Sequence, residues 1–221
     1  MDPLADKYPG ISPYAYCAWN PIKFVDPDGK RVGIIGAYTN ADGTTSSAIF
    51  HYGEVKGVRG FYCNGQRLEN GYAYMATEAI GKIHDGGKYG KMLVDAVVND
   101  DRTIFLINAH EKNDGINESR CVLNKLFWNV ADDRNGDYAP SFITLSHEFG
   151  HFLTYWHKLA DYGTWYDKVT NDEKLVVNME NLIRNENYLD PRKYYEPPSK
   201  GEIPQLTDRV KKFLETISNN P

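Results

Sequence analysis

Residues 140–163 read PSFITLSHEFGHFLTYWHKLADYG, and this stretch is the strongest helix prediction in the chain. Proline is favoured in a first helical turn, so Pro140 suits the start. Gly150 stands in mid-helix, where glycine costs about 1 kcal/mol relative to alanine, so we expect it to let another element pack closely. The apolar residues recur at helical spacing and predict a broad buried face: Phe142, Ile143, Leu145, Phe149, Phe152, Leu153 and Trp156.

The motif inside this helix is His147-Glu148-Phe149-Gly150-His151. Residues four apart share a helix face, so both imidazoles can reach one ion. Glu148 is rotated about 100° from His147, where it can hold a metal-bound water without being a ligand. In such a zinc hydrolase the zinc acidifies water and polarises a carbonyl, and the glutamate takes the proton. With six His and twelve Glu in 221 residues, chance predicts roughly 0.01 copies of the motif.

A third metal ligand must come from elsewhere in the chain. Glu173 lies 22 residues after His151, near the start of a helix expected at about 172–187. A loop followed by a helix can return such a glutamate to the metal, as in sites with two histidines and one glutamate. Glu180 is on the same stripe but about 10 Å further along the axis, so both cannot bind one ion. Glu180 can instead pair with Arg184 at i, i+4.

His157 is the other alternative. It follows His151 by six residues, as in one class of zinc proteases whose chain turns at an intervening glycine. This chain has the β-branched Thr154 at that point, which disfavours the turn. We therefore predict Glu173 as the third zinc ligand, with Glu180 and His157 as alternatives.

Composition limits the classes of function. The 221 residues carry a net charge of -5, which disfavours a nucleic-acid partner and hence a nuclease. No window of about 18 apolar residues predicts a membrane span. The N-terminus has neither the cationic nor the apolar region of a secretory signal peptide. The three cysteines, Cys17, Cys63 and Cys121, fit neither a disulfide framework nor a CxxC metal site, so we expect free thiols.

The rest of the chain predicts an α+β fold, with the HExxH helix beside a mixed or antiparallel sheet. Residues 125–130 are the candidate edge strand on which a peptide substrate would lie. Asn64-Gly65 predicts the tip of a hairpin over 59–75. Strands are expected at 31–39, 46–55, 102–111 and 121–130; helices are expected within 76–99, broken at 85–87, and at about 172–187 and 205–217.

Residues 1–30 differ from the remainder, which suggests a division into a segment of residues 1–30 and a domain of residues 31–221. The segment holds five of the 11 prolines and ends in the turn signal DPDG, so we expect an extended surface segment that contributes nothing to the zinc site. It resembles the end of the RHS repeat-associated core of polymorphic toxins, through DPLADKY, ISPYAYC, NP and FVDPDGK in succession. That resemblance implies an upstream RHS shell, a toxin domain after the DPDG turn, and a cognate immunity protein.

The remainder is similar to the M91-like zinc metallopeptidases that bacteria use as effectors. The similarity is concentrated in LSHEFGHF at 145–152, DEKLVV at 172–177, ENLIR at 180–184 and PRKYY at 191–195. It implies a zincin-like fold and matches the third ligand to Glu173, although Val176 stands where the family has a smaller residue.

The same resemblance implies that Arg192 and Tyr195 lie beside the scissile carbonyl as transition-state stabilisers. Independently, a zinc hydrolase needs a donor for the oxyanion, and a guanidinium or a phenol can serve. Tyr194 and Tyr155 are the alternatives in this role.

These observations predict a zinc-dependent endopeptidase that acts as a secreted toxin or effector on a protein or peptide of a target cell, with Zn²⁺ as cofactor. By the same prediction it is delivered without a classical signal peptide and is cytoplasmic in the producing cell before delivery. The alternative is a catalytically inactive binding or adhesion tip of an RHS protein. Zinc content and dependence on Glu148 distinguish the two.

Overall fold

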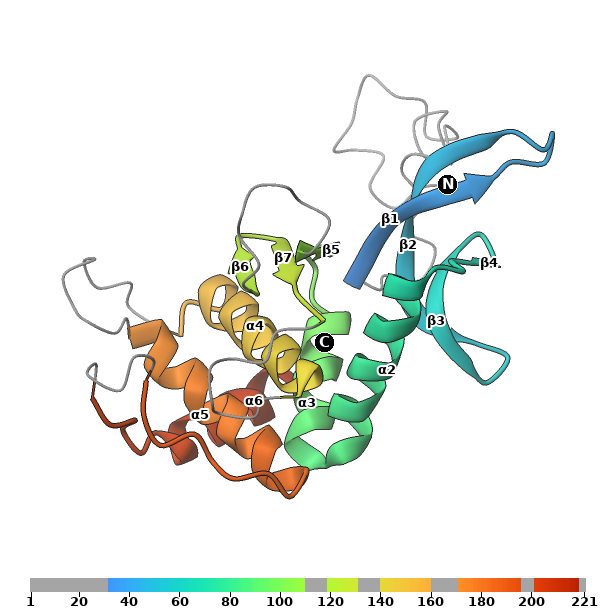
Figure 1. Ribbon diagram of the computed structural model, residues 1–221. Coiled ribbons are helices and arrows are strands. Elements are labelled where there is room, and N and C mark those ends of the chain that lie inside the picture. Colours follow the sequence, from blue (N-terminus) through green and yellow to red (C-terminus); the bar gives the residue numbers. More distant parts are fainter. Residues whose placement is uncertain (1–31, 110–118, 131–139, 160–170, 196–200, 219–221) are drawn as a thin grey trace.

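The computed structural model describes residues 32–109, 119–130, 140–159, 171–195 and 201–218 (Figure 1). Segment 1–30, with its predicted RHS character, lies outside the described residues. Among these residues the fold is α+β, as predicted, with a mixed sheet and five helices. The helices are α2 (Gly71–Gly86), α3 (Lys88–Val98), α4 (Ser141–Trp156), α5 (Asn171–Glu186) and α6 (Thr207–Ser218).

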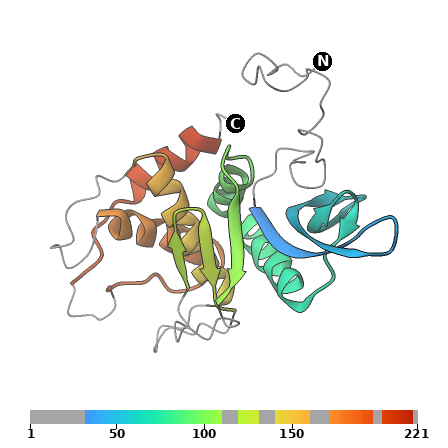
Figure 2. The same ribbon diagram turned by 90° about the horizontal axis from the view of Figure 1, so that it is seen from above.

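The sheet has the order β4-β3-β2-β1-β5-β7-β6. Its strands are β1 (Val32–Thr39), β2 (Thr45–Val55), β3 (Val58–Cys63), β4 (Gln66–Arg67), β5 (Ile104–Asn108), β6 (Arg120–Val122) and β7 (Lys125–Trp128). The pairs β1–β5 and β5–β7 are parallel and the other pairs are antiparallel. Figure 2 shows β5, β7 and β6 beside α4, whereas β1 and β2 extend away on the other side of α2.

The expected hairpin over 59–75 is only partly present. The Asn64-Gly65 turn joins β3 to β4, but β4 is two residues long. The chain then enters α2, because the side chain of Asn70 accepts a hydrogen bond from the Ala73 N–H at 2.7 Å and caps the helix. The expected break at residues 85–87 is confirmed, since α2 ends at Gly86 and α3 begins at Lys88.

The expected strand over 121–130 is wrong in one respect. A turn with Leu123 at φ 58° divides it into β6 and β7, which pair antiparallel. β7 therefore lies between β5 and β6, and the edge strand is β6 rather than residues 125–130. The candidate docking edge for a peptide moves one strand outward.

Helix α4 ends earlier than the predicted residue 163. Its last residue is Trp156, and Lys158 adopts φ 51°. The Leu159 N–H donates to the Thr154 carbonyl at 3.1 Å and the Lys158 N–H donates to the Tyr155 carbonyl at 3.3 Å. These two bonds form a Schellman motif with lysine at the position that glycine usually occupies. The helical periodicity of the sequence gave no sign of this stop.

Candidate metal centre

Three donor atoms converge between α4 and α5. His147 and His151 come from α4, and Glu173 comes from the first turn of α5. The two Nε2 atoms are 3.1 Å apart, and the Glu173 Oε2 lies 3.5 Å from the His147 Nε2 and 3.3 Å from the His151 Nε2. Tetrahedral zinc, with bonds of about 2.0–2.1 Å, needs donors about 3.3 Å apart. The three residues therefore fit a metal ion of this size, and they are the three that we predicted as ligands.

The Nδ1 atom of each imidazole contacts a carboxylate, on the side of the ring that does not face the other donors. The His147 Nδ1 lies 2.9 Å from the Glu180 Oε2, and the His151 Nδ1 lies 2.5 Å from the Asp172 Oδ2. An Nδ1–H that donates to a carboxylate fixes the tautomer and leaves the Nε2 lone pair for a metal. Both histidines are thus prepared as ligands through Nε2.

Glu180 contacts the Nδ1 of His147 and is not one of the three converging donors. Its Oε1 accepts a hydrogen bond from the Arg184 Nε at 2.7 Å, which confirms the expected i, i+4 pair, and Arg192 Nη1 lies 3.4 Å from its Oε2. Burial raises the pKa of Glu180, but His147 and the two arginines outweigh it and lower the pKa to about 2. The carboxylate is therefore ionised across the physiological range.

Asp172 has a role that the sequence analysis did not assign. Its second oxygen accepts a hydrogen bond from the hydroxyl of Thr154, so α4 and α5 both fix it. Burial lowers the pKa of His151, but hydrogen bonds to Asp172 and Glu173 and the charge of Glu148 outweigh this and raise it well above its usual value. The sequence contained one signal for this role, since Asp172 is a second carboxylate directly before the predicted ligand Glu173, at the start of a predicted helix.

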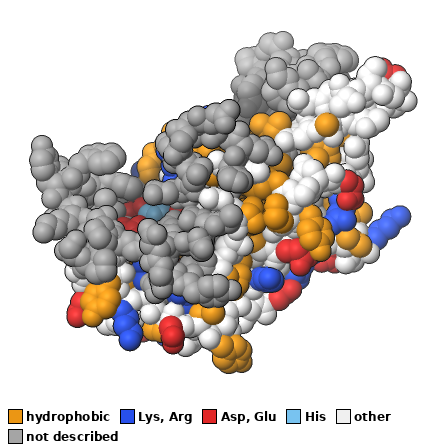
Figure 3. Space-filling model, in the orientation of Figure 1, with side chains coloured by type: hydrophobic (Ala, Val, Ile, Leu, Met, Phe, Trp, Pro, Cys, Tyr) orange, Lys and Arg blue, Asp and Glu red, His pale blue; other side chains and the backbone are white. Residues whose placement is uncertain are grey.

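Glu148, the predicted catalytic base, is a buried residue of α4. Its relative exposure is 2%, equal to that of His147, so almost no bulk water reaches either side chain. Burial raises the pKa of the Cys121 thiol on β6, and the charges of Glu148 and Asp172 raise it further. Helix α4 contacts β6, so the edge strand lies beside the helix that carries the predicted catalytic base. Figure 3 shows histidine and acidic side chains together at the surface over α4.

Tyr195 has a buried hydroxyl. A short backbone pairing holds it, because the Tyr195 N–H donates to the Gly201 carbonyl at 3.3 Å and its ring packs with Val177 and Ile203. Burial, followed by the charge of Glu173, raises the pKa of Tyr195 to about 12. The residue is 3% exposed, and its hydroxyl has no hydrogen-bond partner among the described residues. A buried unpaired donor costs about 1–3 kcal/mol, so this hydroxyl is poised for a ligand.

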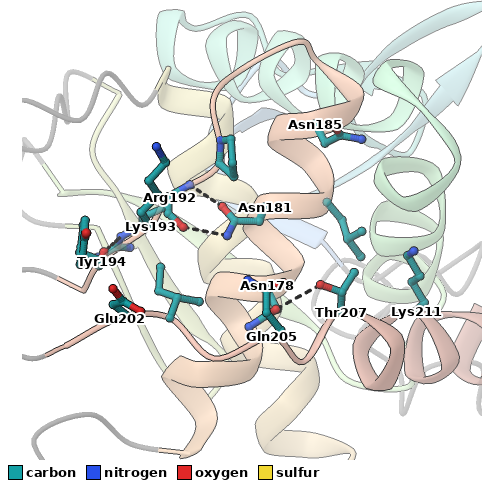
Figure 4. A pocket seen from close by; sticks show the side chains of 13 residues that line it. Asn178, Asn181, Asn185, Arg192, Lys193, Tyr194, Glu202, Gln205, Thr207 and Lys211 are labelled. Atoms are coloured by element: carbon teal, nitrogen blue, oxygen red, sulfur yellow. Dashed lines mark hydrogen bonds between the residues drawn. The ribbon is translucent and has the colours of Figure 1, made fainter.

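Arg192 is buried and contacts the support of His147. The Asn181 side chain clamps its backbone, accepting from the Arg192 N–H at 2.7 Å and donating to the Arg192 carbonyl at 3.0 Å (Figure 4). Its guanidinium reaches Glu180 and donates from Nε to the Tyr194 carbonyl at 3.2 Å. Arg192 therefore contacts Glu180, which contacts His147, and its link to the donor atoms is indirect.

The remaining candidates lie apart from the three donors. His157 caps the end of α4, and its Nε2 is 3.0 Å from the Asp100 Oδ2. Tyr155 is partly exposed, with its ring against Trp156. Tyr194 lines a separate pocket of about 520 Å³ along α5, which contains none of the three donors (Figure 4).

Gly150 has the predicted packing role. A Cβ at this position would lie 3.0 Å from the Val176 Cγ1 and 3.4 Å from the Met179 Sδ, so α5 rests closely against α4 here. Val176 fits here because position 150 carries no side chain. The close approach brings the first turn of α5 near both histidines.

Comparisons with known proteins found no match for the chain among family models, curated proteins or solved structures. Among the described helices, none has the length and apolar character needed to cross a membrane, in line with the prediction of no span.

Proposed function

We propose that the chain is a zinc-dependent endopeptidase with a zincin-like fold. The observation that carries the proposal is the convergence of His147, His151 and Glu173, with a supporting carboxylate on each imidazole and the buried Glu148 beside them. Two nitrogen donors and one carboxylate oxygen are a donor set of catalytic zinc sites that keep one position open. When bound, zinc supplies Lewis acidity that polarises a carbonyl and lowers the pKa of water.

The residues of the chain supply the other parts of the mechanism. Glu148 accepts the proton from the attacking water and returns it to the leaving amine. The Tyr195 hydroxyl donates a hydrogen bond to the oxyanion that develops on the carbonyl oxygen. Arg192 is a positioning residue, because its guanidinium contacts Glu180, which in turn contacts the His147 Nδ1. Bulk solvent has little access to Glu148 and Tyr195, which are both buried, whereas the partly exposed His151 and Glu173 leave the attacking water a way in.

A protein or peptide substrate fits the edge of the sheet. β6 is the outermost strand of the sheet and contacts α4, and Val122 on β6 is exposed. An extended peptide that adds to this edge would bring its backbone to the metal centre. The toxin or effector role, the delivery route and the immunity partner follow from the resemblance of residues 1–30 to RHS cores, and they belong to the same proposal.

Glu148→Gln tests the proposal. The variant should bind zinc in a 1:1 ratio by elemental analysis, because Glu148 is not among the ligands, while hydrolysis falls by about 10²–10⁴-fold through loss of the base. Activity is measured as new peptide N-termini in a bacterial lysate, because this assay assumes no substrate. The matched control is Glu215→Gln, which makes the same chemical change at an exposed position, where Glu215 pairs with Lys88. This variant should keep full activity.

Two results would contradict the proposal. Zinc bound without any cleavage that depends on Glu148 would support the inactive binding tip. Failure of the wild-type chain to bind zinc would exclude the metal centre as well.

A further inference from the structure

An apolar groove opens where the two halves of the sheet separate. β1 and β5 pair only at Val32–Ile104 and Gly33–Phe105, and then the strands diverge. The groove between them encloses about 740 Å³. Figure 3 shows hydrophobic side chains gathered on this face of the molecule. The groove is lined mainly by Ile34, Ile35, Met75, Phe105 and Ile107, with Lys125 at its rim.

The groove also presents backbone edges. Residues 34–39 pair with β2 on one side, and no strand among the described residues pairs with their other side. Residues 106–108 of β5 pair with β7 but not with β1. A strand edge beside exposed apolar side chains is a template for an added strand. Ile35 is 65% exposed at this edge, among the highest values for a large apolar side chain in the described chain.

The N-terminal segment ends at the head of this groove. Residue 31 is followed by Val32, the first residue of β1 and the point where β1 still touches β5. Within residues 1–30, only 14–20 (YAYCAWN) form a stretch of strand length without proline or charge, and Pro13 and Pro21 flank it. Proline is excluded from the interior of a paired strand, so this stretch is the part of the segment that can add to a sheet.

The connection is long enough. Eleven residues lie between Asn20 and Val32. They span up to about 36–40 Å when extended, whereas the six free residues of β1 extend about 20 Å. Covalent attachment also gives the segment a local concentration on the order of millimolar, which favours it over free peptides.

We propose that residues 14–20 occupy the groove as an extended strand along the free edge of β1. Tyr14, Tyr16 and Trp19 bring aromatic surface to a groove of aliphatic and phenylalanine side chains. The added strand joins the two halves of the sheet, which otherwise share two residue pairs. None of His147, His151 and Glu173 lines the groove, so this docking leaves the metal centre open.

The test uses the native Cys17 in the full-length chain. In a Cys63→Ser, Cys121→Ser background, Ile35→Cys or Ala37→Cys is introduced on the exposed face of β1, and mild oxidation follows. A disulfide forms only when the two Cα atoms come within about 7 Å. We expect Cys17 to link within one chain to position 35 or 37 at least about tenfold more than in the Val58→Cys control, as mapped by mass spectrometry. Val58 is also an exposed strand residue, 48% exposed, but does not line the groove.

Hydrogen exchange gives a second measurement. In the full chain, Tyr16→Asp with Trp19→Asp should accelerate amide exchange in residues 34–39 by about tenfold or more, while Tyr8→Asp should not. Zinc content should stay unchanged in both, which separates this inference from the proposed function. Equal cross-linking at position 58, or unchanged exchange in 34–39, would overturn the proposal. Cross-linked dimers in place of cross-linked monomers would overturn it in favour of a second copy.

Discussion

Two clusters of ion pairs connect neighbouring elements of this molecule, and the two clusters differ in their exposure to solvent. At the metal centre, Glu180 bridges His147 and Arg184 with side chains that are 3–4% exposed. At the far side of the sheet, Arg59 of β3 makes two hydrogen bonds to Asp85 of α2, at 2.6 and 2.9 Å, yet the Asp85 side chain is 59% exposed. The contacts are equally short. The difference teaches that burial, and not distance, decides what a charged pair contributes.

The largest expected effect is at Glu180. Glu180→Ala leaves Arg184 and Arg192 buried without their carboxylate, and breaking a buried pair in this way costs about 3–5 kcal/mol of unfolding free energy. Urea unfolding of the metal-free protein measures it. Glu173→Ala is the matched control: it should abolish stoichiometric zinc binding but reduce stability far less, because the Glu173 side chain is a quarter exposed and its removal leaves no buried arginine without a carboxylate. Equal unfolding free energies for Glu180→Ala and Glu173→Ala would contradict the prediction that the buried Glu180 contributes more to stability.

A smaller effect is expected at Asp172. Asp172→Asn keeps the shape of the side chain but removes the charge that orients His151, so zinc affinity should fall about 10–100-fold. Competition with a chelator measures the dissociation constant. Asp190→Asn, at an exposed position after α5, should leave the affinity unchanged. An unchanged affinity in Asp172→Asn would mean that Thr154 and the helix packing orient His151 without the carboxylate.

The histidines of the metal centre should also respond to pH in a range where Asp85 of the surface cluster stays ionised. Burial lowers the pKa of His147 and His151, but the carboxylates outweigh it and raise both pKa values above 6.5. Zinc must displace these protons, so its affinity should fall as pH decreases through the raised pKa values, by up to about tenfold per pH unit for each proton displaced. Calorimetry in buffers of different ionisation enthalpy measures the proton release.

Stability of the metal-free protein should change in the opposite direction. A raised histidine pKa stabilises the folded state below the unfolded value of about 6.5, and this stabilisation is lost as pH rises through the folded pKa. The hydrogen bonds that Asp85 accepts from Arg59 and His84 lower the pKa of Asp85 to about 2, so Asp85 stays ionised in this range. A metal-free protein that becomes more stable from pH 6 to pH 8 would contradict the prediction.

The smallest effect is expected at the surface pair. Asp85→Asn should reduce the unfolding free energy by about 0.2–1 kcal/mol, and by less at high salt, because solvent screens the charge of Asp85. Urea unfolding at low and high ionic strength measures the change. A loss comparable to that of Glu180→Ala would show that burial is not the deciding factor.

The donor residues could be predicted from the sequence because their geometry is local. His147 and His151 share a face through helical spacing alone, and Glu173 required only a loop followed by a helix. The first two strands and the break near Gly87 were also predicted, since alternation and glycine pairs act over a few residues.

The missed features depend on contacts that local patterns do not encode. Asn70 ended the β3–β4 hairpin by capping α2, although the residues after it alternate like a strand. Leu123 adopts a left-handed turn that its side chain does not favour, so a run of strand-like residues became two strands. The position of β6 at the edge and the hold of Asp172 on His151 arise only when the sheet and both helices are assembled.

The lack of a side chain at Gly150 affects the size of ion that the three donor atoms can fit, because it sets the distance between α4 and α5. Because Val176 already lies 3.0 Å from the place of a Cβ, a methyl group there would push α5 outward by a few tenths of an ångström. Glu173 would move with the helix and both histidines would stay, so the triangle of donor atoms would widen on one side only. Selectivity among metals would then shift toward larger ions without a change in any ligand. In the proposed metal centre, the spacing of two helix backbones would therefore contribute to metal preference together with the chemistry of three side chains.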